Sequence, residues 1–251
     1  METIVVKIGT ESLRDFDSNL KVEKMVEAIA TLMSQQIRII LVSSGAVGEG
    51  IKVHPASESK PLLASIGQPI LFEKYRQKFA KLHISAAQFL PAHAQIEDDS
   101  GYRQMAYDTI SSALEAGIIP IVNENDAFSP YEMNALRRGA DNDNNALIMA
   151  QLFRAKSIIL ITNTNGVYSD VTDSASRIPI IKSQSLTDEY VLSLCGAKSE
   201  KGTGGMNSKL LVGRVASQKN IVTHICDGVT SGVIEHVQSS YKGENGGTVI
   251  M

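Results

Sequence analysis

The sequence predicts an α/β fold, a three-layer αβα sandwich with a central, mainly parallel sheet. Short runs of Ile and Val recur along the chain, and segments with helical spacing lie between them. Continuous apolar runs are typical of strands that are buried on both faces, as in a parallel sheet. Because strands and helices alternate, we expect helices on both faces of one sheet. No linker or repeat is evident, and a single domain is expected over residues 1–251.

Six apolar runs are the expected strands: residues 4–6, 39–42, 118–122, 158–161, 221–225 and 248–250. Helices are expected over residues 22–33, 146–153 and 208–219. Long polar or glycine-rich loops are expected at residues 43–60, 123–145 and 199–207. In an open α/β sheet, ligands bind where loops follow the carboxyl ends of strands. The first two of these loops directly follow strands, so we expect the site there.

Composition and charge argue against several classes of protein. The net charge is −3 and the longest basic cluster is the pair Arg137 and Arg138, so no nucleic-acid partner is expected. The chain begins without the pattern of a signal peptide, and no apolar run approaches the length of a membrane span. We therefore expect a cytoplasmic protein with no membrane partner. We interpret Cys195 and Cys226 as reduced core thiols and the scattered histidines as structural.

The first motif that could carry chemistry is residues 5–10, where Lys7 follows a buried run and Gly9 comes two positions later. In a functional interpretation, the glycine lets backbone N–H groups approach a phosphate, and Lys7 supplies positive charge to a phosphoryl group in transfer. In a structural interpretation, Lys7 reaches solvent at a strand end and Gly9 lies in an ordinary turn. This motif alone leaves both interpretations open.

The second motif is the group of small residues Ser43, Ser44 and Gly45, which directly follows the expected strand over residues 39–42. A helix that begins there would direct its free N–H groups at a carboxylate or a phosphate. The spacing matches neither the dinucleotide-binding pattern nor the Walker A pattern. A plain capped turn explains these residues equally well.

The third motif is a concentration of carboxylates and amides in residues 123–126 (Asn-Glu-Asn-Asp) and residues 141–145 (Asp-Asn-Asp-Asn-Asn). Asn side chains both donate and accept hydrogen bonds, so they suit the ammonium and carboxylate ends of an amino acid. A buried Asp could hold lysines in place through charge-assisted hydrogen bonds. Turns and helix N-caps also favour Asp and Asn, but they would explain one or two of these residues and not both clusters.

The fourth motif is residues 202–209 (Gly-Thr-Gly-Gly-Met-Asn-Ser-Lys), which open a predicted helix. Glycines and a hydroxyl before a helix can cradle a phosphate, and Lys209 would add a positive charge in the first turn. A flexible surface loop is the structural alternative. The lysine that follows the glycines favours the phosphate site.

With these elements in this order, the chain resembles the glutamate 5-kinases of the amino acid kinase family, from about residue 3 to residue 250. The most specific match is the pairing of Asn-Glu-Asn-Asp with Asp-Asn-Asp. The resemblance implies the amino acid kinase fold, with glutamate bound mainly by the N-terminal part and ATP mainly by the C-terminal part. It also implies phosphorylation of the glutamate γ-carboxylate as the first step of proline biosynthesis, with Mg²⁺ bridging the phosphates, in a homodimer or homotetramer.

The resemblance also implies roles for single residues. The catalytic residues would be Lys7, Asp143 and Lys209, with Asp143 holding the two lysines in register. Those that bind glutamate would be Ser44, Gly45, Asp126 and Asn142. Those that bind ATP would be Lys7, Gly9, Thr162, Asn163, Thr203, Gly204, Gly205, Met206 and Lys209. No general base is required, because the γ-carboxylate is already ionised at neutral pH and phosphoryl transfer depends mainly on positioning and charge compensation.

The chain departs from the family pattern at a few places. Asn163 stands where the family usually has Asp, so this nucleotide contact keeps a hydrogen-bonding group but loses a charge. Val171 replaces a usual proline. The chain is also expected to be a short form without the C-terminal PUA domain, an RNA-binding type, that many bacterial members carry.

Two alternatives stay open. A sibling kinase could act on another carboxylate or on carbamate, and a non-catalytic nucleotide-sensing module could keep the same fold. The presence of both lysines together with Asp143 favours catalysis over sensing. A dinucleotide-dependent oxidoreductase would need G-x-G-x-x-G after the first strand, and residues 7–11 lack it.

Overall fold

The computed structural model describes residues 1–92, 96–97, 99–128, 142–195, 205–230, 232–237 and 246–251. Its centre is an eight-stranded sheet in the order β3-β4-β2-β1-β5-β9-β10-β8. The strands are β1 (Thr3–Ile8), β2 (Arg38–Val42), β3 (Ala86–Phe89), β4 (Ile119–Val122), β5 (Ser157–Ile161), β8 (Ile180–Ile181), β9 (Val222–Cys226) and β10 (Thr248–Ile250). All neighbours pair in parallel except β10 with β9. The predicted mainly parallel sheet is confirmed.

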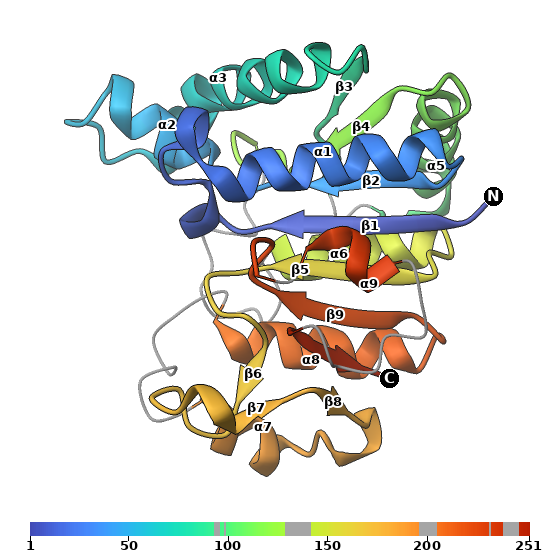
Figure 1. Cartoon of the computed structure of the whole chain (residues 1–251). Helices are drawn as coiled ribbons and strands as arrows, with labels where there is room; N and C mark the ends of the chain where they lie inside the picture. The colour runs from blue at the N-terminus through green and yellow to red at the C-terminus, as the bar shows by residue number, and fades with distance from the viewer. Residues whose placement is uncertain (93–95, 98, 129–141, 196–204, 231, 238–245) are drawn as a thin grey trace.

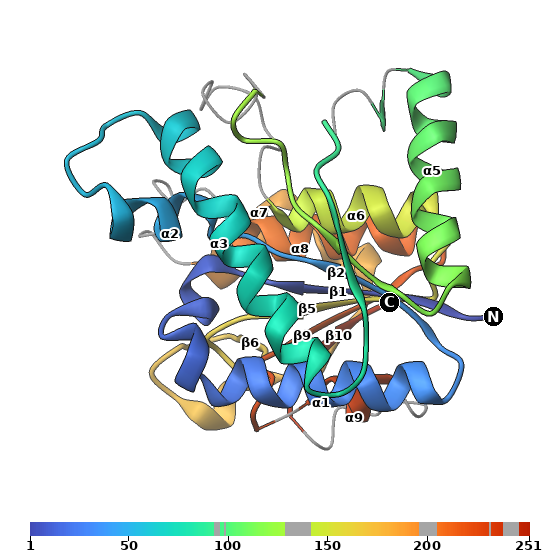
Figure 2. The same cartoon turned by 90° about the horizontal axis from the view of Figure 1, so that it is seen from above.

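Helices cover both faces of this sheet, which makes the predicted three layers (Figures 1 and 2). One face carries α1 (Leu20–Ser34), α3 (Lys60–Ala80) and the short α9 (Val233–Val237). The other carries α5 (Ser100–Glu115), α6 (Asn142–Leu152) and α8 (Met206–Ser217), with α7 (Asp188–Cys195) packed beside α8. A separate hairpin is formed by β6 (Val167–Tyr168) and β7 (Arg177–Ile178).

Each face of the sheet has its own hydrophobic core, and β1 contributes to both. Ile4, Val6 and Ile8 point to the α1 side, whereas Val5 points to the α6 and α8 side. Side chains alternate between the two faces along a strand, so Lys7 points to the same side as Val5. Burial on both faces explains why this strand is a continuous apolar run in the sequence.

The prediction of a long loop over residues 43–60 is wrong in its middle, where α2 (Ala46–Val53) forms. This helix packs closely against α3 through two glycines. A Cβ atom at Gly50 would lie 2.0 Å from the Leu63 carbonyl oxygen, and one at Gly67 would lie 1.9 Å from the Ala46 carbonyl oxygen. The two helices therefore touch backbone to backbone, a tertiary fit that hydrophobic spacing does not reveal.

Other boundaries also differ from the predicted ones. The elements α3, α5 and β3 were not predicted, and α8 begins at Met206, two residues before the predicted start at residue 208. The predicted loop over residues 123–145 ends where α6 begins at Asn142, and its residues 129–141 lie outside the described residues. Residues 199–204 of the third predicted loop also lie outside them.

Two features of the structure bear on the expected compartment, namely the state of the cysteines and the character of the helices. Cys226 is buried in β9 and Cys195 is half-buried at the end of α7, and they do not form a disulfide with each other. Across the described ranges, none of the helices combines the length and the apolar character needed to cross a membrane.

Candidate active site

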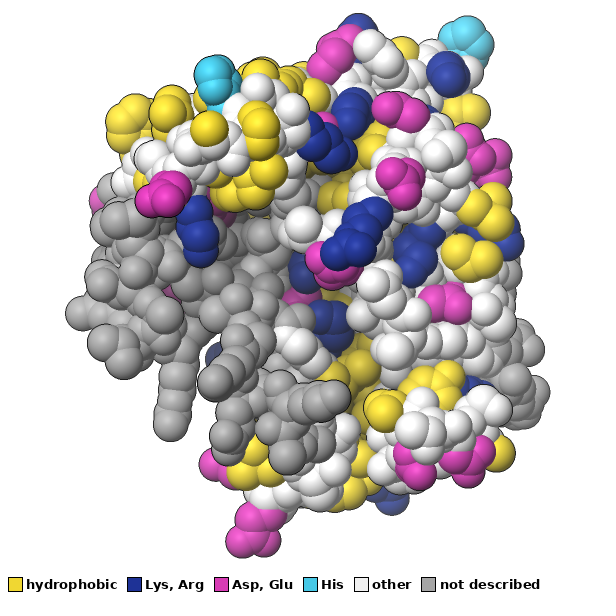
Figure 3. All heavy atoms as spheres, turned by 90° about the vertical axis from the view of Figure 1, so that its left-hand side faces the viewer, with side chains coloured by type: hydrophobic (Ala, Val, Ile, Leu, Met, Phe, Trp, Pro, Cys, Tyr) yellow, Lys and Arg dark blue, Asp and Glu magenta, His cyan; other side chains and the backbone are white. Residues whose placement is uncertain are grey.

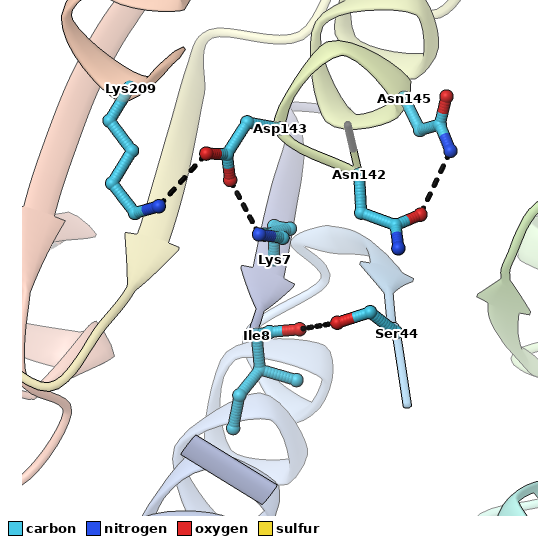
Figure 4. A network of polar contacts seen from close by, with 7 residues as sticks. All are labelled: Lys7, Ile8, Ser44, Asn142, Asp143, Asn145 and Lys209. Carbon is cyan, nitrogen blue, oxygen red and sulfur yellow. Dashed lines mark hydrogen bonds and ion pairs between the residues drawn. The ribbon is translucent and has the colours of Figure 1, made fainter. Parts of the chain in front are cut away.

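Three charged side chains from distant parts of the chain meet at the carboxyl end of the sheet (Figure 4). Lys7 Nζ lies 2.5 Å from Asp143 Oδ1, and Lys209 Nζ lies 2.9 Å from Asp143 Oδ2. Each carboxylate oxygen therefore receives one ammonium donor. The predicted role of Asp143, to hold the two lysines in register, matches this arrangement.

All three side chains of this cluster are buried. The exposed fractions are 3% for Lys7, 0% for Asp143 and 5% for Lys209. Burial alone would raise the pKa of Asp143, but the two ammonium groups outweigh burial and hold it below its ordinary value. Two lysines thus face one ionised carboxylate in a site that is shielded from water. Such a site attracts an anion.

Asp143 and Lys209 both lie near the N-terminal end of a helix, where the helix dipole affects their charges in opposite ways. Asp143 lies in the first turn of α6, where a carboxylate is favoured by the helix dipole. Lys209 lies in the first turn of α8, as the sequence predicts, where a positive charge is disfavoured. Among the described residues, Asp143 is a partner that offsets the unfavourable position of the Lys209 ammonium group at this helix end.

The two serines after β2 have different surroundings. The Ser43 hydroxyl lies 2.9 Å from the Tyr75 hydroxyl, inside the core on the α3 side. The Ser44 hydroxyl donates to the Ile8 carbonyl oxygen at 3.2 Å, one residue after Lys7 (Figure 4). Gly45 follows with φ at +104° and is the N-cap of α2, so only Gly45 of these small residues needs the freedom of glycine. Ser44 thus contacts the residue that follows Lys7, and Gly45 comes next in the chain.

The remaining two residues predicted to bind glutamate lie at the start of α6 and after β4. Asn142 begins α6 next to Asp143, and its Oδ1 accepts a hydrogen bond from Asn145 Nδ2 at 2.9 Å (Figure 4). Asp126 is half-buried in the turn after β4, a strand that is paired with β2. Ser44 and Asp126 thus follow neighbouring strands at the same edge of the sheet.

The residues predicted to bind ATP gather around β1, β5 and α8. Gly9 follows β1, and a Cβ atom there would lie 3.6 Å from Lys7 Nζ, so its lack of a side chain keeps the approach to this ammonium group open. Gly205 is the exposed N-cap of α8, and Met206 is its first residue. Thr203 and Gly204 lie outside the described residues. Figure 3 shows this edge of the sheet, where basic and acidic side chains lie together.

Thr162 and Asn163 follow β5 and contact two residues that the sequence analysis missed. Lys21 Nζ donates to the Thr162 carbonyl oxygen at 2.8 Å and to Asn163 Oδ1 at 3.3 Å. The Ser12 hydroxyl donates to the same Asn163 Oδ1 at 3.0 Å. Burial lowers the pKa of Lys21, and the nearby Asp227 carboxylate offsets part of this effect. No motif singles out Lys21, which is one lysine near the start of a helix.

The comparisons with known proteins agree with this fold. The sequence pattern of the amino acid kinase family matches residues 2–227. Glutamate 5-kinase of Haemophilus influenzae (strain PittGG) is 34% identical over 245 residues, which cover 93% of this chain and 65% of that protein. Glutamate 5-kinase of Dehalococcoides mccartyi (strain CBDB1) is 34% identical, and the match covers 98% of this chain and 67% of that protein. Glutamate 5-kinase 1 of Bacillus licheniformis is 33% identical, and the match covers 99% of this chain and 69% of that protein. The chain therefore spans about two-thirds of the length of these curated relatives.

A solved structure of similar fold is the carbamate kinase from Giardia lamblia bound to AMP-PNP. It superposes with a TM-score of 0.65 at 13% sequence identity, over 100% of this chain and 98% of that one. At this identity the likeness concerns the fold alone. The family pattern covers most of the chain, and relatives at about one-third identity cover nearly all of it. The chain belongs to the amino acid kinase family.

Proposed function

We propose that this chain transfers the γ-phosphoryl group of ATP to the γ-carboxylate of L-glutamate, giving γ-glutamyl phosphate for proline biosynthesis. The observation that supports it best is the buried cluster of Lys7, Asp143 and Lys209, which offers two ammonium groups at fixed positions. Charge accumulates on the transferring phosphoryl group, so phosphoryl transfer needs such groups more than it needs a base. The choice of glutamate is supported by the curated relatives that are named glutamate 5-kinase.

In this proposal, Lys7 and Lys209 neutralise the γ-phosphoryl group while Asp143 keeps their ammonium groups a fixed distance apart. Backbone N–H groups near Gly9 assist them. The attacking atom is a carboxylate oxygen of glutamate that already carries its charge, so no proton has to be removed from it. The bond from this oxygen to the γ-phosphorus forms as the bond to the β–γ bridging oxygen breaks, and ADP leaves with the electron pair.

The proposed substrates occupy the two sides of this cluster. Glutamate lies on the side of β2 and β4, where Ser44, Gly45, Asp126 and Asn142 bind it. ATP lies on the side of β5 and α8, where Thr162, Asn163 and residues 203–209 bind it. We place this reaction in the cytoplasm and in a homodimer or homotetramer, and light scattering of the purified protein would test the assembly.

Mg²⁺ fits this site as a partner of the nucleotide. Among the described residues, no group of three or more His, Cys, Asp or Glu side chains could hold a metal ion. Both oxygens of Asp143 face lysines, so this carboxylate is occupied. Mg²⁺ usually keeps several waters and binds substrate phosphates with few protein ligands. When bound with the nucleotide, it would reduce the negative charge of the phosphates.

The test is an assay of ATP consumption against glutamate, N-acetylglutamate, aspartate, carbamate and UMP. Hydroxylamine should convert the acyl phosphate that glutamate yields into a hydroxamate. We expect glutamate to give the largest kcat/KM. Consumption that is stimulated by carbamate or UMP alone would contradict the proposed substrate.

Lys209→Met should separate catalysis from binding. We expect kcat to fall by about 100-fold or more, because one donor to the developing charge is lost, with a smaller change in KM for either substrate. The matched control is Lys219→Met, an exposed lysine just beyond the end of α8. Near-normal kcat in folded Lys209→Met would remove this lysine from the catalytic step.

A further inference from the structure

The loop after β4 is anchored by a buried side chain of α3. Gln68 Oε1 accepts a hydrogen bond from Asn123 Nδ2 at 2.7 Å, and Asn123 Oδ1 accepts from the backbone N–H of Glu124 at 2.9 Å. A backbone N–H group can only donate, so the oxygen of the Asn123 amide faces Glu124 and its nitrogen faces Gln68. Both side chains are buried, so the link between them is shielded from water. Each of the two amides therefore has one defined orientation.

Asn123 is the base of the turn that carries Asp126. Its backbone N–H donates to the Phe89 carbonyl oxygen at the end of β3, at 3.1 Å. Across the turn, the Phe128 N–H donates to the Asn125 carbonyl oxygen at 3.0 Å, and the half-buried Asp126 lies between these two residues. The direction in which the chain leaves β4 thus depends on how Asn123 is held.

The same turn of α3 also contacts the segment that follows β2. Gly67 precedes Gln68, and a Cβ atom at Gly67 would lie only 1.9 Å from the Ala46 carbonyl oxygen. Ala46 begins α2, directly after Ser44 and Gly45. One turn of α3 therefore fixes the segments after both β2 and β4, through the backbone of Gly67 and the side chain of Gln68.

Gln68 is an unusual residue for the buried face of α3. The other buried residues of this helix are apolar or glycine, apart from Tyr75, whose hydroxyl lies 2.9 Å from that of Ser43. Both polar residues thus contact the first residue after a strand, Asn123 after β4 and Ser43 after β2. A buried amide is costly unless it is hydrogen-bonded, whereas an apolar side chain of similar length would fill the core without this requirement. The amide at residue 68 is therefore better explained by the loop that it holds than by the core.

We propose that Gln68 is a positioning residue for the amino acid substrate. It holds Asn123, and through Asn123 the turn with Asp126, in the geometry that binds glutamate. This inference rests on the proposed function, because it takes the residues after β2 and β4 to bind glutamate. Loss of the Gln68 amide should weaken the binding of glutamate and leave the nucleotide side of the site, at β5 and α8, unchanged.

The experiment compares Gln68→Met with the wild type in the assay of glutamate-dependent ATP consumption. Methionine keeps the length of the side chain, but its thioether is a weak acceptor, so the buried Asn123 Nδ2 loses its partner. We expect KM for glutamate to rise by about tenfold, and kcat and KM for ATP to stay within about threefold of the wild type. Gln77→Met is the matched control, because Gln77 is exposed on the same helix and contacts only Glu73 among the described residues. It should leave both KM values unchanged.

A double-mutant cycle tests whether Gln68 acts through Asn123. Asn123→Ala removes the other end of the link, so Gln68→Met added to it should raise KM for glutamate no further. Gln68→Asn keeps an amide but is one methylene shorter, and it should raise KM for glutamate by a smaller factor. This milder variant tests the same link should Gln68→Met fail to fold.

An unchanged KM for glutamate in folded Gln68→Met or Gln68→Asn would overturn this inference and leave the proposed function intact. An equal rise in KM for glutamate and for ATP would do the same, because the effect would then not be confined to the loop after β4. Factors that multiply in the double variant would show that Gln68 does not act through Asn123 and would also overturn it. Wild-type protein whose ATP consumption does not respond to glutamate would overturn the proposed function, and this inference with it.

Discussion

Replacement of Asp143 by Asn should reveal how strongly the buried cluster depends on its single negative charge. The substitution keeps the size and shape of the side chain. Its Oδ1 can still accept from one lysine, but its amide nitrogen then faces the ammonium group of the other, donor against donor. Both buried lysines lose the carboxylate that they share. Asp143→Asn therefore removes a charge and also one of the two hydrogen bonds.

The expected loss in free energy of unfolding is large, although the substitution replaces only one carboxylate oxygen by an amide nitrogen. Loss of one partner of a buried ion pair lowers the free energy of unfolding by about 3–5 kcal/mol, against a typical total of about 5–15 kcal/mol. For a chain of this length, each kcal/mol shifts the melting temperature by about 2–4 °C. Asp143→Asn should therefore melt about 6–20 °C below the wild type.

Thermal unfolding followed by circular dichroism, together with urea titration at neutral pH, measures this difference. Asp108→Asn is the control, because Asp108 is exposed on α5, where it accepts from Gln104, and its loss should change stability by about 0.5 kcal/mol or less. The lysines hold the pKa of Asp143 below its ordinary value, so its contribution is present above that value and lost as the pH falls through the lowered pKa. The difference between wild type and Asp143→Asn should thus be constant from pH 5 to 7. An unfolding free energy within about 1 kcal/mol of the wild type would refute the assignment of Asp143 as a stabilising partner of the two buried lysines.

Two further substitutions test other parts of the structure. Gly67→Ala should lower the free energy of unfolding by about 1–3 kcal/mol or more and raise KM for glutamate, because the new Cβ meets the Ala46 carbonyl oxygen and displaces α2 from α3; unchanged urea midpoints would contradict this. Burial, with the charge of His236, lowers the pKa of His224 to about 3. The unfolded state therefore binds more protons than the folded state below about pH 6.5, and about 2 kcal/mol should be lost between pH 7 and 5. His224→Asn should flatten this slope while His54→Asn, at an exposed position, should not; equal slopes in all three would refute the assignment.

The sheet was predictable because burial on both faces leaves a mark in the sequence. β1, β2, β4, β5 and β9 all lie where runs of Ile and Val predict them. β3 was missed because it lies at the edge of the sheet, with half-buried side chains and the sequence Ala-Ala-Gln-Phe. An edge strand is buried less, so its apolar pattern is weaker.

The helix α2 could not be predicted for a different reason. Its eight residues are too few to form a stable helix alone, so its stability comes from packing. The packing depends on Gly50 in α2 and Gly67 in α3, because each glycine lets its helix contact the backbone of the other. A single glycine in a sequence usually indicates a turn, and these two indicate a close helix contact instead.

The charged cluster shows the limit of local spacing most clearly. Asp143 lies 136 positions from Lys7 and 66 from Lys209, so no periodicity relates them. Residue types indicated that carboxylates, amides and lysines serve an anionic substrate, but only family resemblance indicated which carboxylate meets which lysines. The physical reason is that parallel strands bring their carboxyl ends together regardless of their order in the chain.

The surroundings of Asn163 could not be predicted from local sequence either. From the sequence it is a departure from the family pattern, a lost charge in the nucleotide site. In the structure its oxygen is taken by Lys21 and Ser12, residues that no motif connects with it. The amide nitrogen lies on the side away from Lys21, and it is a donor. The change from Asp to Asn at this place therefore does more than remove a charge, because it reverses the hydrogen-bonding character of the group that faces away from Lys21.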